Sequence, residues 1–268
     1  ISAVKGERDM NPRNRNAVVV SVGVAVLVFL ACAEVRAQET FASIGSAFIE
    51  IKYQRGTPEK EVRELLEFLQ RDREAITAEL GFESEKKITV KIYTTVGQFR
   101  SDAKVKENWR EVVFSRGTLH VQPLELLLEE GTLDRTMSYE LALAILEDAW
   151  SLGCPQWLRE AYAVYHSGML ESLTPPIGVR HTSFADLDQD LQEHTKPPQL
   201  DDVHYVLGQT MLFFIKGYGA AKAFGVYAAF DGNQAVEKVF EKVFEEEYAE
   251  IEKKWASTIR TDAFPTEQ

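Results

Sequence analysis

Cysteine is nearly absent from this chain, which has two in 268 residues, Cys32 and Cys154. Cys32 falls in an N-terminal segment that we expect to be removed, so Cys154 would remain alone. One cysteine cannot form an intramolecular disulfide, and a lone buried thiol behaves as a small apolar side chain. Packing must therefore stabilise the fold.

Basic residues are also fewer than acidic ones. The chain has 30 Lys and Arg and 42 Asp and Glu, which gives a net charge of −12. The first 37 residues hold five of the basic and three of the acidic residues, so the rest has 25 basic and 39 acidic residues and a charge of −14. Nucleic acids and anionic membranes attract basic proteins, and we expect neither surface as a partner.

Internal repeats and low-complexity tracts are missing as well. The composition, 45% hydrophobic and 27% charged, is that of an ordinary globular protein. A chain of this length holds one large domain or two small lobes around a sizeable core.

The N-terminal 37 residues differ from the rest. Arg13 and Arg15 precede an apolar run from Ala17 to Ala33, and Val35-Arg36-Ala37 supplies small residues at the cleavage positions. This pattern is typical of a secretory signal peptide. We expect an extracytoplasmic protein, periplasmic or secreted, with Met10 as the start of translation.

Two alternatives to cleavage stay open. The apolar run could remain as an inner-membrane anchor, although its 17 residues are fewer than the roughly 20 that span a bilayer. A lipid attached to Cys32 is the other alternative. In either case the membrane is reached only through this segment, with residues 38–260 as the folded domain and 261–268 as a flexible tail.

The first half of the domain alternates between strand and helix patterns. Period-two alternation predicts strands over 45–54 and 87–93. Apolar residues at helical spacing predict a helix from 58 to 80 between them, with Pro58 in its first turn and Gly81 at its end. A short helix over 95–103 and a hairpin formed by 112–114 and 118–121 follow. This lobe is therefore a small sheet with helices.

The second half is helical. Between its helices, residues 174–202 are rich in Pro, Asp and polar side chains and predict a long loop with one short helix near 184–191. The fold class is α+β, with a sheet-and-helix lobe followed by a mainly helical lobe. Apolar residues three and four apart predict helices over 136–151, 156–166, 206–216, 220–230, 233–243 and 247–257.

Two segments of the second half carry a resemblance. Thr132 to Leu143 reads TLDRTMSYELAL, and Cys154 to Tyr165 reads CPQWLREAYAVY. Together they resemble the peptidase MA-like domains of the gluzincin group, the thermolysin-like zinc metallopeptidases. In that group a helix with His-Glu-x-x-His is followed by a short turn, a Pro-x-Trp-Leu segment and a second helix that supplies a glutamate. The resemblance extends over most of residues 45–258 and implies a site cleft between two lobes.

The resemblance also implies a set of site positions. In the family, two histidines one turn apart hold Zn²⁺, and the glutamate beside the first is the general base for a metal-bound water. Laid on this chain, the first histidine position is Tyr139, the general-base position is Glu140, the second histidine position is Leu143 and the third-ligand position is Glu160. Only the two glutamates match.

These departures predict the loss of the metal. Leucine has no lone pair to offer, tyrosine is a rare zinc ligand that must first lose its proton, and one carboxylate does not hold Zn²⁺. Without the metal, Glu140 would have to activate ordinary water. We therefore expect no zinc cofactor and a catalytically inactive protein that binds a peptide or a cell-envelope partner, or serves as a scaffold or assembly module.

A divergent metallopeptidase is the alternative, with Glu140 as base and a rebuilt metal site. Its ligands would be Glu160 and histidines in or beside the long loop, namely His181, His194 and His204.

Other sites have weaker support. The acidic run Asp186 to Asp190 lacks the glycine of a calcium loop at Leu191, so we expect a solvated acidic face. Ser138 and Ser167 are not in a Gly-x-Ser-x-Gly motif, which disfavours a serine hydrolase.

Overall fold

The computed structural model describes residues 41–81, 84–105, 110–176, 181–194 and 196–262. The chain separates into two compact units, Ile1–Phe41 and Ala42–Gln268. The signal peptide predicted for residues 1–37 lies outside the described residues. The same holds for the predicted tail from 263 onward, whereas residues 261 and 262 are the end of the last helix.

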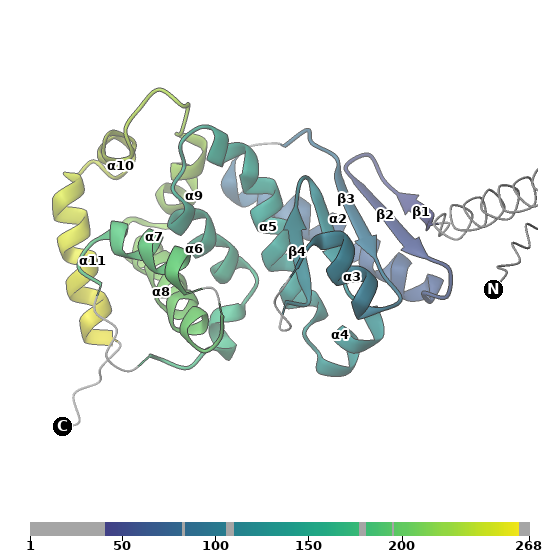
Figure 1. Cartoon of the computed structure of the whole chain (residues 1–268). Helices are drawn as coiled ribbons and strands as arrows, with labels where there is room; N and C mark the ends of the chain where they lie inside the picture. Colours follow the sequence, from purple (N-terminus) through teal and green to yellow (C-terminus); the bar gives the residue numbers. More distant parts are fainter. Residues whose placement is uncertain (1–40, 82–83, 106–109, 177–180, 195, 263–268) are drawn as a thin grey trace, which may run out of the picture. The chain divides into compact units, whose positions relative to one another are not determined.

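A mixed sheet forms the first part of the described chain (Figure 1). Its strand order is β1-β2-β3-β5-β4, in which β2, β3 and β5 run parallel and β4 pairs antiparallel with β5. The edge strand β4 therefore follows the parallel strands in space. The strands are β1 (Phe41–Gly45), β2 (Ile49–Gln54), β3 (Ile88–Ile92), β4 (Val112–Ser115) and β5 (Thr118–Val121).

The strand predicted over 45–54 is in fact divided. The chain turns after Gly45, where the backbone N–H of Ser46 donates to the Ile49 carbonyl at 2.7 Å. A Cβ at position 45 would lie 2.7 Å from the same carbonyl oxygen, so only glycine fits this turn. Period-two alternation continues through the turn, and the pattern alone therefore conceals it.

Helices connect the parallel strands, as such connections require. Helix α2 (Glu59–Leu80) links β2 to β3, and α3 (Val96–Ala103) lies between β3 and β4. Both helices were predicted within one residue of their bounds. Pro58 is the N-cap of α2 rather than part of its first turn, and Gly81 ends the helix with φ of 68°.

The predicted hairpin is confirmed. Residues Arg116 and Gly117 join β4 to β5 with φ values of 52° and 76°. Positive φ at both central positions is the geometry of a tight turn between twisted antiparallel strands. This hairpin places β4 at the edge of the sheet.

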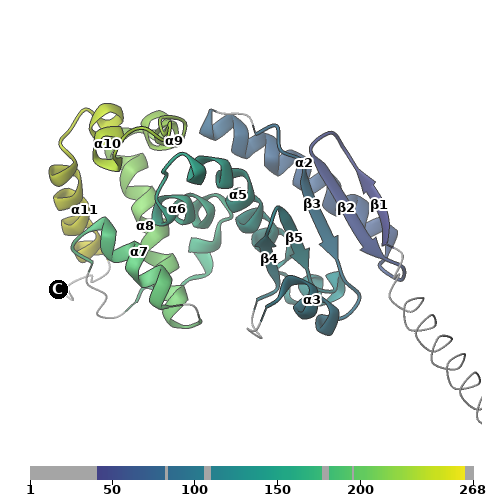
Figure 2. The same ribbon diagram turned by 45° about the horizontal axis from the view of Figure 1, so that its top comes forward.

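The rest of the chain is helical, and the α+β class is confirmed. The strands lie together at one end of this unit, helices α6 to α11 lie at the other, and α5 runs between them (Figures 1 and 2). No helix among the described residues has the length and apolar character needed to cross a membrane. The helices are α4 (Leu124–Glu130), α5 (Leu133–Ser151), α6 (Gln156–His166), the 3₁₀ helix η1 (Met169–Ser172), α7 (Phe184–Glu193), α8 (Gln199–Tyr218), α9 (Ala220–Ala228), α10 (Val236–Phe244) and α11 (Tyr248–Asp262).

Helices α4 and α8 differ most from the prediction, whereas α5 begins three residues earlier and α10 three residues later than predicted. Helix α4 was not predicted, because Leu126 and Leu128 are exposed and the run has no clear apolar face. Helix α8 begins at Gln199 rather than near 206, directly after Pro197 and Pro198. The short helix predicted near 184–191 within the loop over 174–202 is confirmed as α7, and the last four residues of that predicted loop belong to the first turn of α8.

Close packing of α6 against α8 fixes the helical part. Gly208 of α8 faces α6 and η1, and a Cβ there would lie 2.9 Å from Leu170 Cδ1 and 3.1 Å from Val164 Cγ1. The absence of a side chain lets the two helices approach. This approach brings the first turns of α8 close to Glu160 of α6, as the site geometry below shows.

Aromatic side chains fill the core between α6, α7, α8 and α11. Phe184 is fully buried and lies at its centre, with ring centroids 4.5 Å from Trp157 and 4.6 Å from Trp255. Its ring also lies within 6.1 Å of Phe214 and Phe240. This cluster holds α7 against the helices that carry the candidate site.

Candidate functional site

A cavity of about 430 Å³ brings three of the four predicted positions together. Tyr139 and Glu140 of α5 and Glu160 of α6 all line it. Leu143 is not among the lining residues and instead packs, half-buried, against the core. Four other segments complete the walls: the residues before β4, η1, the end of α7 and the start of α8.

Tyr139 closes a polar network in this cavity. Its hydroxyl donates to Glu160 Oε2 and lies 3.3 Å from His204 Nε2. Burial raises the pKa of Tyr139 well above its ordinary value, and the negative charges of Glu160 and Glu140 raise it further. The phenol is therefore protonated at neutral pH and acts as a donor to the Glu160 carboxylate.

Glu140 points to the sheet. Its Oε2 accepts the backbone N–H of Phe114 in β4 at 3.0 Å, and the residue is 6% exposed. Burial raises the pKa of Glu140 to about 7, against the opposing effects of Arg110 and the Phe114 N–H. Near neutral pH this carboxyl is therefore present in both its protonated and its ionised form, as a general acid or base should be.

His204 is neutral in this environment. Burial lowers its pKa to about 4, and the nearby charge of Arg110 lowers it further. Burial also raises the pKa of Glu160, although the Tyr139 hydroxyl and Arg159 oppose this shift. Around Tyr139 the site thus combines the Arg110 cation, the neutral His204 imidazole and the carboxyls of Glu140 and Glu160. The other charged or titratable side chains that line the cavity are Glu111, Arg135, His194 and Asp201.

The histidines of the predicted loop are only partly gathered here. His204 and His194 line the cavity, but His204 belongs to α8 rather than to a loop. His181 lines a smaller neighbouring cavity of about 80 Å³. His166 is not among the residues that line the main cavity.

Arg110 is the site residue that the sequence did not indicate. It lies just before β4, lines the cavity and lowers the pKa of Glu140 by its positive charge. No motif or spacing marks it, because it reaches α5 only through the fold of the β4–β5 hairpin. The sequence likewise gave no indication that the Phe114 N–H would contact Glu140.

The acidic run in α7 is not the solvated face that was expected. Asp186 forms a capping box with Ser183 at the start of the helix. Asp188 accepts the backbone N–H of Trp157 at 2.8 Å and so joins α7 to α6. Both carboxylates satisfy backbone donors at helix N-termini, which is a structural task.

A second polar cluster joins α2 to α5 and α6. His166 places Nε2 3.0 Å from Asp72 Oδ1 and Nδ1 3.1 Å from Glu79 Oε2. Ser138 donates to Asp72 at 2.6 Å, and Tyr162 donates to Glu79 at 2.8 Å. The cluster connects the helix that covers the sheet to the helical part of the chain.

The His166 cluster predicts a pH-dependent stability. Burial opposes the charged imidazole, but the two carboxylates outweigh it and raise the pKa of His166 from 6.5 to about 9. The contribution is fully present below pH 6.5 and is lost as the pH rises through about 9. We expect the wild type to lose about 1–3 kcal/mol more than His166→Gln between pH 6.5 and 9.5. Urea unfolding at both pH values measures this; equal losses in the two proteins would contradict it.

Comparison of the sequence with protein-family models and with curated proteins gives no match. The resemblance to gluzincins therefore rests on the sequence alone, chiefly on the segments Thr132 to Leu143 and Cys154 to Tyr165. The geometry of the cavity stands independently of it.

Proposed function

We propose that this chain is an exported, catalytically inactive gluzincin-like protein that binds a peptide or another extended cell-envelope ligand in the cavity beside α5. The observation that carries the proposal is the contact of the Tyr139 hydroxyl with Glu160 and His204. These polar groups satisfy one another where the family would hold a metal ion.

The residues at these positions do not fit zinc. Leu143 provides no donor atom and packs against the core. Tyr139 would have to lose a proton whose pKa is raised well above its ordinary value. The two partners of the Tyr139 hydroxyl, Glu160 and His204, are ordinary ligands, but zinc in proteins takes three or four.

The chemistry of the cavity favours a peptide-like ligand. Its volume lies within the range of small-ligand sites. Arg110 and Glu140 provide a cation and a carboxyl that hydrogen-bond amide or carboxylate groups, while Leu173 and Leu200 provide apolar wall. An extended chain with alternating polar backbone and apolar side chains complements such a surface.

Zinc content and hydrolysis test the inactive character. Elemental analysis of untreated protein should give the same zinc content for the wild type and for Glu160→Gln. Casein and a fluorogenic peptide pool should be cleaved no faster by wild type than by Glu140→Gln. If Glu160→Gln lost bound zinc and His194→Ala kept it, the metal would be bound in the main cavity and the proposal would be wrong.

Binding is tested by filling the cavity. Thr136 lines it and is half-buried, so Thr136→Phe should weaken binding of a fluorescein-labelled pool of random hexapeptides about tenfold or more. The matched control is Asp134→Phe, an exposed position on the same helix outside the cavity. Equal binding by both variants, measured by fluorescence anisotropy, would show that peptides do not use this cavity.

A divergent hydrolase is the second candidate, and the pKa of Glu140 is the observation that favours it. A carboxyl with a pKa of about 7 in a cavity is suited to general acid–base catalysis. This candidate predicts turnover that changes with an apparent pKa near 7 and falls about 10²–10⁴-fold in Glu140→Gln. Activity that survives that substitution would exclude Glu140 as the base.

A further inference from the structure

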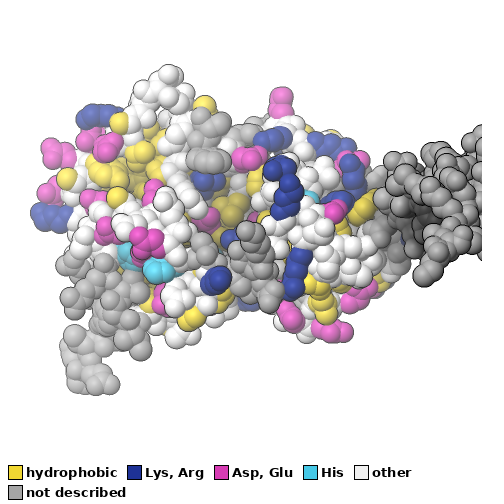
Figure 3. Space-filling view, in the orientation of Figure 1, with side chains coloured by type: hydrophobic (Ala, Val, Ile, Leu, Met, Phe, Trp, Pro, Cys, Tyr) yellow, Lys and Arg dark blue, Asp and Glu magenta, His cyan; other side chains and the backbone are white. Residues whose placement is uncertain are grey.

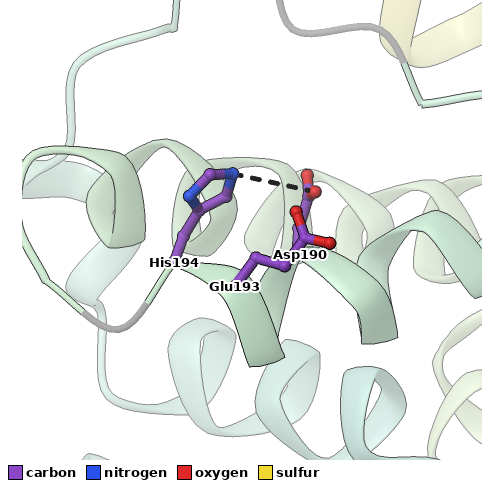
Figure 4. Close-up of side chains that lie close together, drawn as sticks. All are labelled: Asp190, Glu193 and His194. Carbon is purple, nitrogen blue, oxygen red and sulfur yellow. Dashed lines mark ion pairs between the residues drawn. The ribbon is translucent and has the colours of Figure 1, made fainter.

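The last turn of α7 gathers three side chains of metal-ligating types, of which His194 also lines the main cavity. Asp190, Glu193 and His194 are spaced so that they share one side of a helical turn. One ligand atom from each lies within 4.8 Å of the other two. Figure 4 shows the His194 ring directed toward the Asp190 carboxylate, with the Glu193 carboxylate beside it.

A buried histidine orients the central carboxylate. His181 is 3% exposed, and its Nε2 lies 2.6 Å from Asp190 Oδ2. The other oxygen, Asp190 Oδ1, lies 3.8 Å from His194 Nε2. One oxygen of Asp190 is therefore fixed from the protein interior while the second faces His194, as in metal sites where a hydrogen bond orients the ligand.

The same histidine leaves an unsatisfied atom in this region. His181 Nδ1, which is not the ring atom that contacts Asp190, is buried and has no hydrogen-bond partner among the described residues. His181 lines the 80 Å³ cavity together with Asp190, His194 and Asp202 of α8. A cavity of this size holds an ion with one or two waters.

An ion pair alone does not explain the cluster. His194 and Asp190 are 39% and 29% exposed, and at 3.8 Å such a pair contributes at most about 1 kcal/mol. Glu193 adds a second negative charge beside Asp190, which repels it, and contacts Gln189 Nε2 through Oε1 at 2.8 Å. Two carboxylates and one imidazole around one point offer the ligand atoms that a divalent cation would bring together.

We propose that Asp190, Glu193 and His194 form a binding site for a divalent transition-metal ion of the zinc class. The ligands are Asp190 Oδ1, a Glu193 carboxylate oxygen and His194 Nε2, with water completing the shell and His181 holding Asp190. A mixed imidazole and carboxylate set suits Zn²⁺, Co²⁺ or Ni²⁺, whereas Ca²⁺ prefers oxygen alone. The C-terminal end of α7 also attracts a cation.

The observed spacing needs little adjustment. Two ligands of a tetrahedral zinc ion, each about 2.0–2.2 Å from the metal, lie roughly 3.4 Å apart. The separation of 3.8 Å between His194 Nε2 and Asp190 Oδ1 closes to this value by small side-chain rotations. On the face drawn in Figure 3, histidine side chains lie beside acidic ones in the region of α7, so an ion can enter from solvent.

This site is independent of the proposed function. His194 lines both cavities, so an ion that it binds would lie in the wall of the main cavity, and neither Tyr139 nor Glu160 is among its proposed ligands. Glu160→Gln should leave its affinity unchanged. A metal in the main cavity and a metal at α7 are thereby distinguishable.

Titration with Zn²⁺ and Co²⁺ tests the proposal. Isothermal calorimetry of the purified protein, stripped by chelator and dialysed, should give about one equivalent of bound Zn²⁺. His194→Ala and Asp190→Asn should each weaken binding about 100-fold, and His181→Gln about tenfold. Co²⁺ should show a visible absorption band that is lost in His194→Ala.

The matched control is Gln192→Ala, an exposed residue of the same turn outside the cluster, which should bind as the wild type does. Circular dichroism confirms that each variant is folded. Failure of the wild type to bind below roughly 1 mM Zn²⁺ would overturn the proposal. So would binding that His194→Ala and Asp190→Asn leave unchanged.

Discussion

The double substitution Tyr139→His with Leu143→His is expected to create a zinc site at the positions where the resembled family has its two histidines. On α5 the two positions are one turn apart and share a face, and Glu160 already faces position 139 across the cavity. Two imidazoles and this carboxylate are a sufficient ligand set for Zn²⁺. We expect about one equivalent of zinc by elemental analysis in the His194→Ala background, which removes the proposed α7 site.

Chelation provides a second readout for this variant. Metal that binds only the folded state raises the melting temperature, so a chelator should lower it in the double variant and leave the His194→Ala parent unchanged. Adding Glu160→Gln should weaken zinc binding at least about tenfold. A folded double variant that takes up no zinc would count against the assignment of these positions by resemblance.

Phe184→Ala is expected to lower the free energy of unfolding by about 3–5 kcal/mol. The ring is fully buried. Its centroid lies 4.5 Å from that of Trp157, on which it stacks, and 4.6 Å from that of Trp255. Removing it leaves a cavity between α6, α7 and α11 that the surrounding rigid rings fill poorly. Urea denaturation followed by tryptophan fluorescence measures the loss.

The matched control for this prediction is Leu128→Ala. Leu128 is 49% exposed on α4, so its truncation should cost less than about 1 kcal/mol. Similar losses in the two variants would mean that the aromatic cluster does not hold the helical part together. A loss confined to α7 would instead appear as local unfolding without a change in the global midpoint.

Local patterns predicted much of the fold. Helix α2 buries Val62, Leu65, Leu69, Ile76 and Leu80 on one face. Their helical spacing in the sequence predicts this face. The β4–β5 hairpin was equally clear, because Arg116-Gly117 separates two apolar runs. Helix α6 matches its predicted bounds at both ends. In each case the local signal and the tertiary packing agree.

The missed features depend on contacts distant in sequence. His166 meets Asp72 and Glu79, which precede it by 94 and 87 residues, and no spacing rule predicts that meeting. Arg110 and the Phe114 N–H reach Glu140 only because β4 packs on α5. The sequence did indicate Tyr139, Glu140 and Glu160, through the pattern of two adjacent helices. It gave no indication that Tyr139 would contact Glu160 directly.

Three consecutive residues of α5 point to three different neighbours. Ser138 contacts Asp72 of α2, Tyr139 contacts Glu160 of α6, and Glu140 contacts the edge strand. Any rotation of the helix about its axis would break all three contacts at once. The cavity wall is therefore preorganised, so a ligand should associate without waiting for a conformational change and should lose little affinity to ordering the protein.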